Sequence, residues 1–268
     1  MISNRTVRQI AFSFLIPALL ACSMVSAPLT QNSPGVPVLA SPIKFVIPDG
    51  LAETASVENI DVITDQTGAP WEVAPAHIEI TLQSYALQTS FHVAQIFVYH
   101  AAQYAAVNSS AAESLKRLQS ILADPNKLYT NDVLPYVPFF NAGQVIASQE
   151  RVIHFQGGSG IRIVTKYAQD VSPIDNNTLF YHFQGLSNDG QFYIIAVLPT
   201  NAPLLAADNN PDSPVPSGGI PFPQNTAPGT SFETYYAQIT DMLNQTPSAK
   251  FNPSLDVLDG LVQSISIQ

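Results

Sequence analysis

The sequence has little charge and a single cysteine. Only 11% of its 268 residues are Asp, Glu, Lys or Arg, whereas about a quarter is usual in globular domains. Because Cys22 is the one cysteine, no disulfide can form within the chain. Uncharged amides and hydroxyls supply most of the polar character, and this balance suits an extracytoplasmic protein.

Basic residues are especially scarce, with ten Lys and Arg against twenty Asp and Glu. Two of the ten, Arg5 and Arg8, lie close to the N-terminus, and among the others only Lys116 and Arg117 are adjacent. Nucleic-acid binding requires clustered basic residues, so we predict no nucleic-acid partner. Anionic lipid headgroups would also repel an acidic surface, so any membrane attachment must come from inserted hydrophobic groups.

Long hydrophobic runs are missing except near the N-terminus. There an apolar run extends from Ile10 to Leu20, after two basic residues and before small residues. This is the layout of a signal peptide. A transmembrane helix needs roughly 20 apolar residues, so the run is too short for a permanent span.

The segment Leu19-Leu20-Ala21-Cys22 at the end of this run resembles the lipobox of bacterial lipoproteins. The resemblance implies that residues 1–21 are removed and that Cys22 becomes the mature N-terminus with a diacylglyceryl group on its thiol. Two acyl chains suffice for stable anchoring. The membrane, reached through the lipid on Cys22, would then be a partner, on the outer face of the cytoplasmic membrane or at the outer membrane. The alternatives are a secretory signal cut after Ala27 and an uncleaved anchor.

The predicted signal segment is followed by a stretch rich in proline and small polar residues. We predict a flexible tether over residues 22–42, because this stretch has no periodic apolar face. The remaining residues, 43–268, are predicted to form one domain. A division into two smaller domains within residues 125–138 is the alternative.

Alternating or β-branched segments predict an antiparallel sheet. Breakers separate the later strands, and Asn188-Asp189-Gly190 is a strong hairpin turn. The predicted strands are 43–47, 58–64, 77–82, 93–99, 144–155, 161–168, 179–186 and 192–198.

Three segments have helical spacing of apolar residues. A middle helix is expected after a cap near Asn108 and ends near Pro125, and two C-terminal helices are expected over 232–245 and 254–264. Strands grouped before helices predict an α+β fold, a mainly antiparallel sheet of about six to eight strands packed by these helices.

Sequence motifs for catalysis fail on inspection. His154 and Ser159 lie near Gly157-Gly158-Ser159-Gly160, but Ile161 stands where a nucleophile elbow needs glycine, so these are predicted to be turn residues. The five histidines, His77, His92, His100, His154 and His182, lack the short spacing of a metal site. We predict no catalytic residue, no metal and no cofactor.

A long proline-rich segment, 200–230, carries the candidate surface. Asp208, Asn210 and Asp212 alternate as at the start of a calcium loop, but no glutamate closes the pattern, so a solvated turn is favoured. Phe222, Phe232, Tyr235 and Tyr236 flank the end of the segment. If exposed, they could bind a partner or a sugar ring, whereas packing onto the core is the alternative. The candidate partner or ligand surface is Phe222, Tyr235, Tyr236, Asp208 and Asp212.

Together these features predict a lipid-anchored, extracytoplasmic, non-catalytic binding or interaction module of the cell envelope. Two other classes of function stay open. One is an exported hydrolase whose catalytic residues are dispersed along the chain and converge in a pocket. The other is a structural envelope protein with large exposed apolar patches.

Overall fold

The computed structural model describes residues 35–69, 71–88, 90–125, 133–136, 141–224 and 231–268. The predicted signal segment, Cys22 and the first part of the predicted tether lie outside the described residues. No helix in these ranges is both long and apolar enough to cross a membrane.

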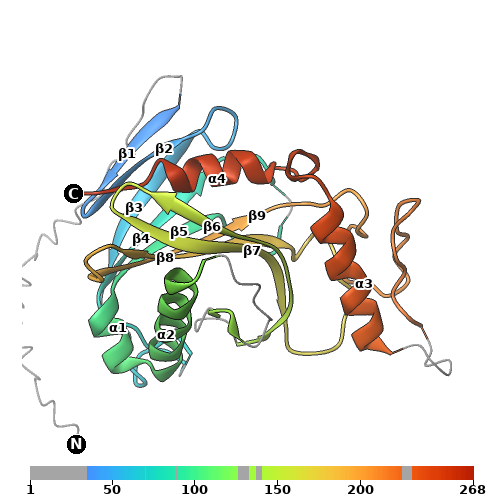
Figure 1. Ribbon diagram of the computed structural model, residues 1–268, viewed down its shortest axis with the longest axis horizontal. Helices are drawn as coiled ribbons and strands as arrows, with labels where there is room; N and C mark the ends of the chain where they lie inside the picture. The colour runs from blue at the N-terminus through green and yellow to red at the C-terminus, as the bar shows by residue number, and fades with distance from the viewer. Residues whose placement is uncertain (1–34, 70, 89, 126–132, 137–140, 225–230) are drawn as a thin grey trace, which may run out of the picture.

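A seven-stranded antiparallel sheet forms the centre of the fold, which confirms the predicted α+β class (Figure 1). Its strands follow the spatial order β3-β4-β5-β9-β8-β7-β6. The strands are β3 (Thr54–Ile60), β4 (His77–Gln83), β5 (Gln95–His100), β6 (Gly143–Phe155), β7 (Gly158–Ala168), β8 (Phe180–Ser187) and β9 (Phe192–Pro199).

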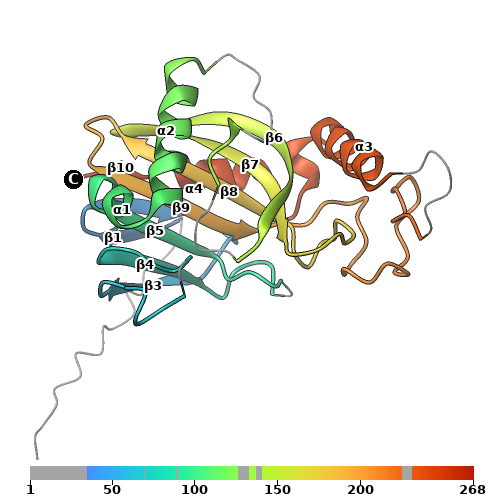
Figure 2. The same ribbon diagram turned by 90° about the horizontal axis from the view of Figure 1, so that it is seen from below.

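Two helices cover one face of the sheet, α1 (Ala101–Val107) and α2 (Ser109–Ala123). Figure 2 shows α2 lying across the strands. Asn108 is the predicted N-cap of α2, and its side chain accepts a hydrogen bond from the Ala111 amide at 3.1 Å. Leu115, Leu118 and other apolar residues of α2 pack with aromatic residues of β5, β8 and β9 in one buried cluster.

The opposite face is covered by α4 (Leu255–Gln263) and a second, three-stranded sheet of β1 (Val36–Ala40), β2 (Ile43–Ile47) and β10 (Ser266–Ile267) (Figure 1). The prediction of a flexible tether up to residue 42 was wrong for Val36–Ala40, which pairs with β2 along its whole length. Proline is tolerated in β1 because this strand lies at the edge of its sheet.

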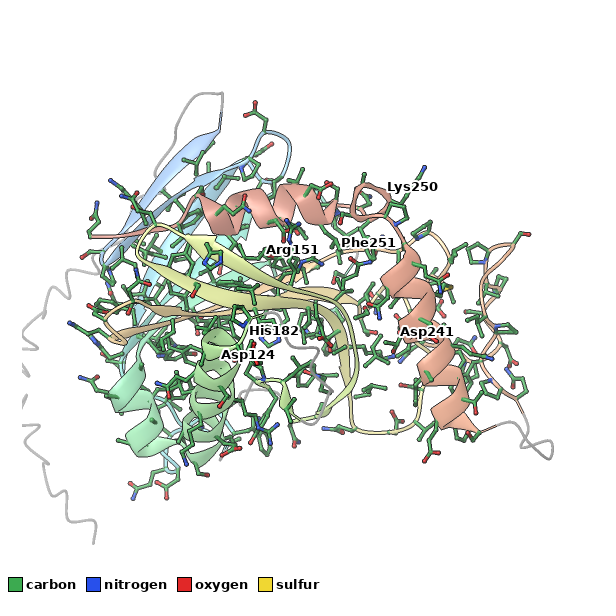
Figure 3. All side chains as sticks on the ribbon, in the orientation of Figure 1. Asp124, Arg151, His182, Asp241, Lys250 and Phe251 are labelled. Atoms are coloured by element: carbon green, nitrogen blue, oxygen red, sulfur yellow. The ribbon has the colours of Figure 1, made fainter. Side chains whose placement is uncertain are left out.

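Buried charges join α4 to the central sheet beneath it. Asp259 of α4 is 3% exposed. It accepts a hydrogen bond from the Tyr181 hydroxyl at 3.0 Å and lies 3.3 Å from Arg162 Nε and 3.4 Å from Arg151, which Figure 3 labels. The carboxylate therefore has a partner on each of β6, β7 and β8, and these partners offset the cost of its burial.

The helix α3 (Phe232–Gln245) has the bounds that the sequence predicts and packs at one end of β6. A short 3-10 helix, Ser248–Lys250, joins it to the segment before α4.

Two predictions about the strands of the central sheet were wrong. The strand β3 begins and ends four residues before the predicted 58–64, and Gly158–Gly160 belong to β7 rather than to a turn.

Candidate functional site

A cleft of about 750 Å³ opens where β7 ends and β8 begins. This volume lies within the range of small-molecule sites, roughly 300–1,000 Å³. Its walls come from four parts of the chain that are far apart in sequence. We call it the β7–β8 cleft and define it by Phe91, His92, Asn141, Tyr167, Asn177 and Thr178, with Lys166 and three further polar residues also lining it.

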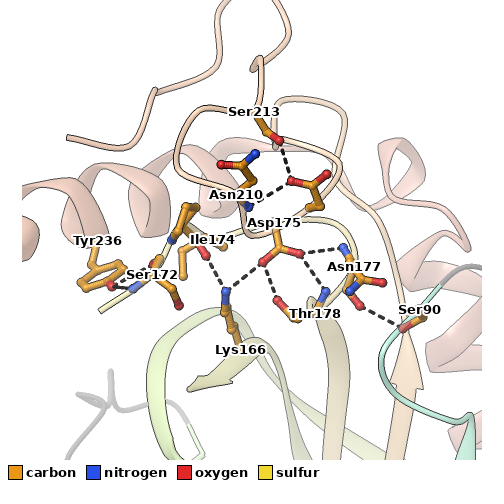
Figure 4. A network of polar contacts seen from close by, with 12 residues as sticks. Ser90, Lys166, Ser172, Ile174, Asp175, Asn177, Thr178, Asn210, Ser213 and Tyr236 are labelled. Atoms are coloured by element: carbon orange, nitrogen blue, oxygen red, sulfur yellow. Dashed lines mark hydrogen bonds and ion pairs between the residues drawn. The ribbon is translucent and has the colours of Figure 1, made fainter. Parts of the chain in front are cut away.

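A buried ion pair lies beside the cleft (Figure 4). Lys166 Nζ is 2.8 Å from Asp175 Oδ2, and the two side chains are 2% and 0% exposed. The same ammonium group donates to the Pro173 carbonyl. Asp175 also accepts from the Thr178 hydroxyl at 2.7 Å and from the backbone amides of Asn177 and Thr178 at 2.9 and 3.1 Å. Both charges are thus satisfied within the protein, as stable burial requires.

Hydrogen bonds to the backbone around Asp175 hold the walls of the cleft together. The Phe91 amide donates to the Asn177 carbonyl at 2.7 Å, and the Ser90 hydroxyl donates to the same oxygen at 3.3 Å (Figure 4). On the other side, the Asn176 amide donates to the Ala206 carbonyl at 2.9 Å. These bonds join the walls of the cleft to one another, and walls fixed in this way lower the entropic cost of binding a ligand.

An exposed aromatic ring stands at the rim of the cleft. Phe91 is 72% exposed, the most exposed large hydrophobic residue in the described ranges. Its ring meets the His92 ring edge-on with centroids 5.1 Å apart, and His92 in turn lies 4.4 Å from the ring of buried Phe180. The Phe91 ring thus contacts the His92 ring while much of its surface faces solvent.

Two histidines next to the cleft have strongly lowered pKa values. Burial lowers the pKa of His92 to about 4, although the negative charge of Asp175 acts in the opposite direction. Burial lowers the pKa of His182 to about 3, and the neighbouring His92 adds to this effect. Figure 3 labels His182, which lies 3.2 Å from Gln184 Nε2 through its own Nε2. Both rings are therefore neutral at pH 7.

The hydroxyl groups of Thr178 and Tyr167, two residues that line the cleft, donate hydrogen bonds to other protein groups. Thr178 donates to Asp175, and the Tyr167 hydroxyl donates to Gln144 Oε1 at 3.2 Å. The Asp175 carboxylate oxygens already accept from Lys166, from Thr178 and from two backbone amides, so protein donors occupy them. This arrangement suits binding better than nucleophilic attack.

The aromatic residues of the sequence-predicted surface pack onto the core to different degrees. Tyr235 is 4% exposed, and its hydroxyl accepts from the Ile174 amide at 3.0 Å. Tyr236 is half-buried, and its hydroxyl bonds the backbone of Ser172 (Figure 4). Phe222 is also half-buried, stacked on Phe232 with centroids 5.4 Å apart. These rings support the loop that carries Asp175 and leave little aromatic surface open.

The two aspartates of that predicted surface are exposed in a turn of the 200–224 segment. Asp208 accepts from the Asn210 amide at 3.0 Å and from the Ser213 hydroxyl, and these bonds lower the pKa of its carboxyl group. The Asp212 amide donates to Asn210 Oδ1 at 3.1 Å. Asn209, between them in sequence, is a residue that lines the β7–β8 cleft. The surface predicted from the sequence therefore includes neighbours of Asn209 in the chain, but it does not include Phe91, Lys166 or Asp175.

The remaining histidines do not form a metal site with other ligands. Across the described ranges, no group of three or more His, Cys, Asp or Glu residues could hold a metal ion.

His154 and Ser159 face each other in the β6–β7 ladder. Gly158 is required there because a Cβ atom would lie 2.3 Å from the Phe155 ring.

Two other hollows are less suited to a specific ligand. An open groove of about 880 Å³ lies along α3, with Met242 and Ile220 among its lining residues and Asp241 and Lys250 at its edge (Figure 3). A cleft of about 450 Å³ lies beside His77, whose two ring nitrogens face the Pro75 carbonyl at 2.8 Å and Glu79 at 3.4 Å. In the first, the buried lining residue Thr246 already donates its hydroxyl to the Met242 carbonyl at 2.9 Å, and in the second His77 is already paired.

Comparison with known proteins adds no constraint. No protein-family model matches the chain, and neither the curated proteins nor the solved structures contain a match.

Proposed function

We propose that this chain is a lipid-anchored, exported binding protein whose β7–β8 cleft holds a small ligand without transforming it. One observation carries the proposal: a preformed cleft presents an exposed ring, Phe91, beside an ion pair that is already satisfied by protein groups. A cleft with a few fixed polar groups and an exposed apolar surface is the usual form of a ligand site.

The state of the charged groups favours binding over catalysis. An enzyme would be expected to hold a base or nucleophile whose charge or lone pair is available to the substrate. Here the Lys166 ammonium group and the Asp175 carboxylate neutralise each other at 2.8 Å and are almost fully buried. The neutral ring of His92 can pack against a ligand, while its lowered pKa makes it a weak base at pH 7.

The proposed anchor rests on the lipobox-like segment that ends at Cys22. Metabolic labelling with a clickable fatty acid tests it directly, with wild type compared to Cys22→Ala in a bacterial host. We expect label on the wild-type chain alone and, by mass spectrometry, a mature N-terminus at Cys22. An unlabelled wild-type chain, or one with an unmodified Cys22 inside the mature polypeptide, would contradict the anchor.

Saturation-transfer NMR with a fragment library tests the cleft. The full chain, extracted in detergent, is compared with Phe91→Ala and with the control Val93→Ala, since Val93 is 56% exposed in the same loop but does not line the cleft. We expect a set of fragments whose signal is lost only in Phe91→Ala and which are recovered chemically unchanged after prolonged incubation. Conversion of a bound fragment would favour the hydrolase, and fragments insensitive to Phe91 would place the ligand elsewhere.

A further inference from the structure

We infer that the ligand of the β7–β8 cleft is a neutral saccharide, an inference that rests on the proposed binding function and adds the chemical class. It combines three properties of the lining residues: their charge, their exposed ring and their side-chain amides.

Charge excludes an anionic ligand. Among the described residues, Lys166 is the one Lys or Arg that lines the cleft, and its side chain is 2% exposed and paired with Asp175. Asp170, an exposed carboxylate, also lines the cleft. A phosphate, sulfate or uronate would therefore meet a negative group and, among the described lining residues, no available cation, within a chain of formal net charge −10.

The exposed ring suits a ligand with an apolar face. Phe91 is held on one side by its backbone bond to Asn177 and by the His92 ring. A saccharide ring presents a face of C–H groups that can pack on such an aromatic surface, which buries apolar area on both partners. A flexible aliphatic chain would gain the same area, but it would leave the polar groups of the lining without partners.

The amides around the ring suit hydroxyl groups. Asn141, Gln169, Asn177 and Asn209 all line the cleft, and each side-chain amide offers both a donor and an acceptor. Saccharide hydroxyls likewise donate and accept, so neighbouring hydroxyls can pair with one amide. The side-chain amide of Gln169 donates through Nε2 to the backbone carbonyl of Asn141 at 2.7 Å, which fixes these two residues relative to each other. Proline-rich peptides, by contrast, dock in grooves lined by several aromatic residues.

A glycan array containing neutral, acidic and amine-bearing glycans tests the inference. The full chain in detergent is applied beside Phe91→Ala, Phe91→Trp and the control Val93→Ala, and Kd for the strongest glycan is then measured by calorimetry. We expect binding confined to neutral glycans, a Kd about tenfold higher or more for Phe91→Ala, and a Kd for Phe91→Trp within about threefold of wild type. Val93→Ala should bind as wild type does.

The possible outcomes test the saccharide inference separately from the proposed binding function. Preference for acidic glycans, or equal binding by wild type and Phe91→Ala, would overturn the saccharide inference. Fragments that depend on Phe91 in the NMR screen, without any glycan binding, would overturn it while leaving the proposed function intact. Because Phe91 is 72% exposed, its variants should unfold at the wild-type temperature, so lost binding reports on the cleft.

Discussion

At the scale of single residues, the Asp175 carboxylate does the most to position the candidate site. Its side chain joins β7 through Lys166 and the segment before β8 through Thr178, and backbone pairing at Asp175 and Asn176 adds the segment around Ala206. The side chain is fully buried. Such a group stabilises the fold only while all of its partners remain in place.

We therefore expect Asp175→Ala to lower the free energy of unfolding by about 3–5 kcal/mol, because the buried Lys166 ammonium group loses its counter-charge. Urea denaturation measures this. Asp175→Asn is the matched variant, since its amide oxygen can still accept from the backbone amides, and it should lose less. An Asp175→Ala variant as stable as wild type would show that the ion pair contributes nothing net.

A second residue-scale prediction concerns pH. The pKa of buried His182 is about 3, against 6.5 for a free histidine. Below pH 6.5 the unfolded chain binds a proton that the native chain excludes, so the free energy of unfolding falls as pH drops from 6.5 toward 3. At pH 5 this one residue should account for about 2 kcal/mol of lost stability.

His182→Gln should make the fall in stability between pH 7.5 and pH 5 shallower, as measured by urea denaturation at each pH. The control is His154→Gln, because His154 is exposed on β6. If His182→Gln and wild type lose equal stability over this range, the native state admits the proton and the burial argument is wrong.

At the scale of elements, the end of α3 is held by a bulge in β6. Gln149 has a φ of 57°, and the β6–β7 register shifts between Ser148 and Arg151. Its side-chain amide donates to the Leu243 and Thr246 carbonyls at 2.6 and 2.8 Å. Helix C-termini leave such carbonyls without partners, so the bulge supplies a cap from another element.

Gln149→Ala should therefore lower the free energy of unfolding by about 1–3 kcal/mol, because these carbonyls lose a donor. Thermal or urea denaturation measures the change. Gln245→Ala is the control, since Gln245 is an exposed residue in the last turn of α3 and should change stability by less than about 0.5 kcal/mol. Equal effects of the two substitutions would contradict the capping role.

Most elements could be predicted because their local signals agree with their packing. The bounds of α3 follow from Ser231, whose side chain caps the helix, and from buried residues at helical spacing. Four of the described elements were not predicted, one of them the short 3-10 helix Ser248–Lys250. Helix α1 follows β5 directly and has no side-chain cap, β1 contains a proline, and β10 is a strand of two residues. Their stability comes from tertiary pairing, which a single sequence does not display.

At the scale of the whole molecule, the β7–β8 cleft could not be predicted because no local motif encodes it. Its residues come from around positions 91, 141, 166–178 and 209. What the sequence could indicate was its composition, with many amides and few charges. Lys166 and Asp175 are nine positions apart without a motif, and only the fold turns them into a buried pair.

The two sheets also meet far from the cleft. The backbone bonds between Gln156 and the pair Ile265 and Ile267 lie at the turn of the β6–β7 hairpin, while the cleft lies at the other end of β7. Deleting residues 265–268 should lower the free energy of unfolding by about 3 kcal/mol or more, because fully buried Ile265 is lost.

The affinity of the cleft for its ligand should be unchanged by this deletion at temperatures where the variant is folded, since roughly 30 Å of strand separate the two places. Gln268→Ala, which alters one exposed side chain, is the control for stability. Weaker ligand binding by the folded deletion variant would mean that the two ends of the hairpin are coupled.

The hairpin of β1 and β2 determines how the domain would respond to a mechanical load on the proposed anchor. Its open end is the pair Val36 and Ile47, next to the N-terminal segment, and its turn lies beyond Ala40. A pull on the proposed anchor at Cys22 would first break the bond from the Gly35 amide to Asp49 Oδ1 and then open the ladder one pair at a time, from Val36 toward the turn. The strand β1 would thus detach from β2 and lengthen the segment between the proposed anchor and the domain, while the central sheet with the β7–β8 cleft stays paired.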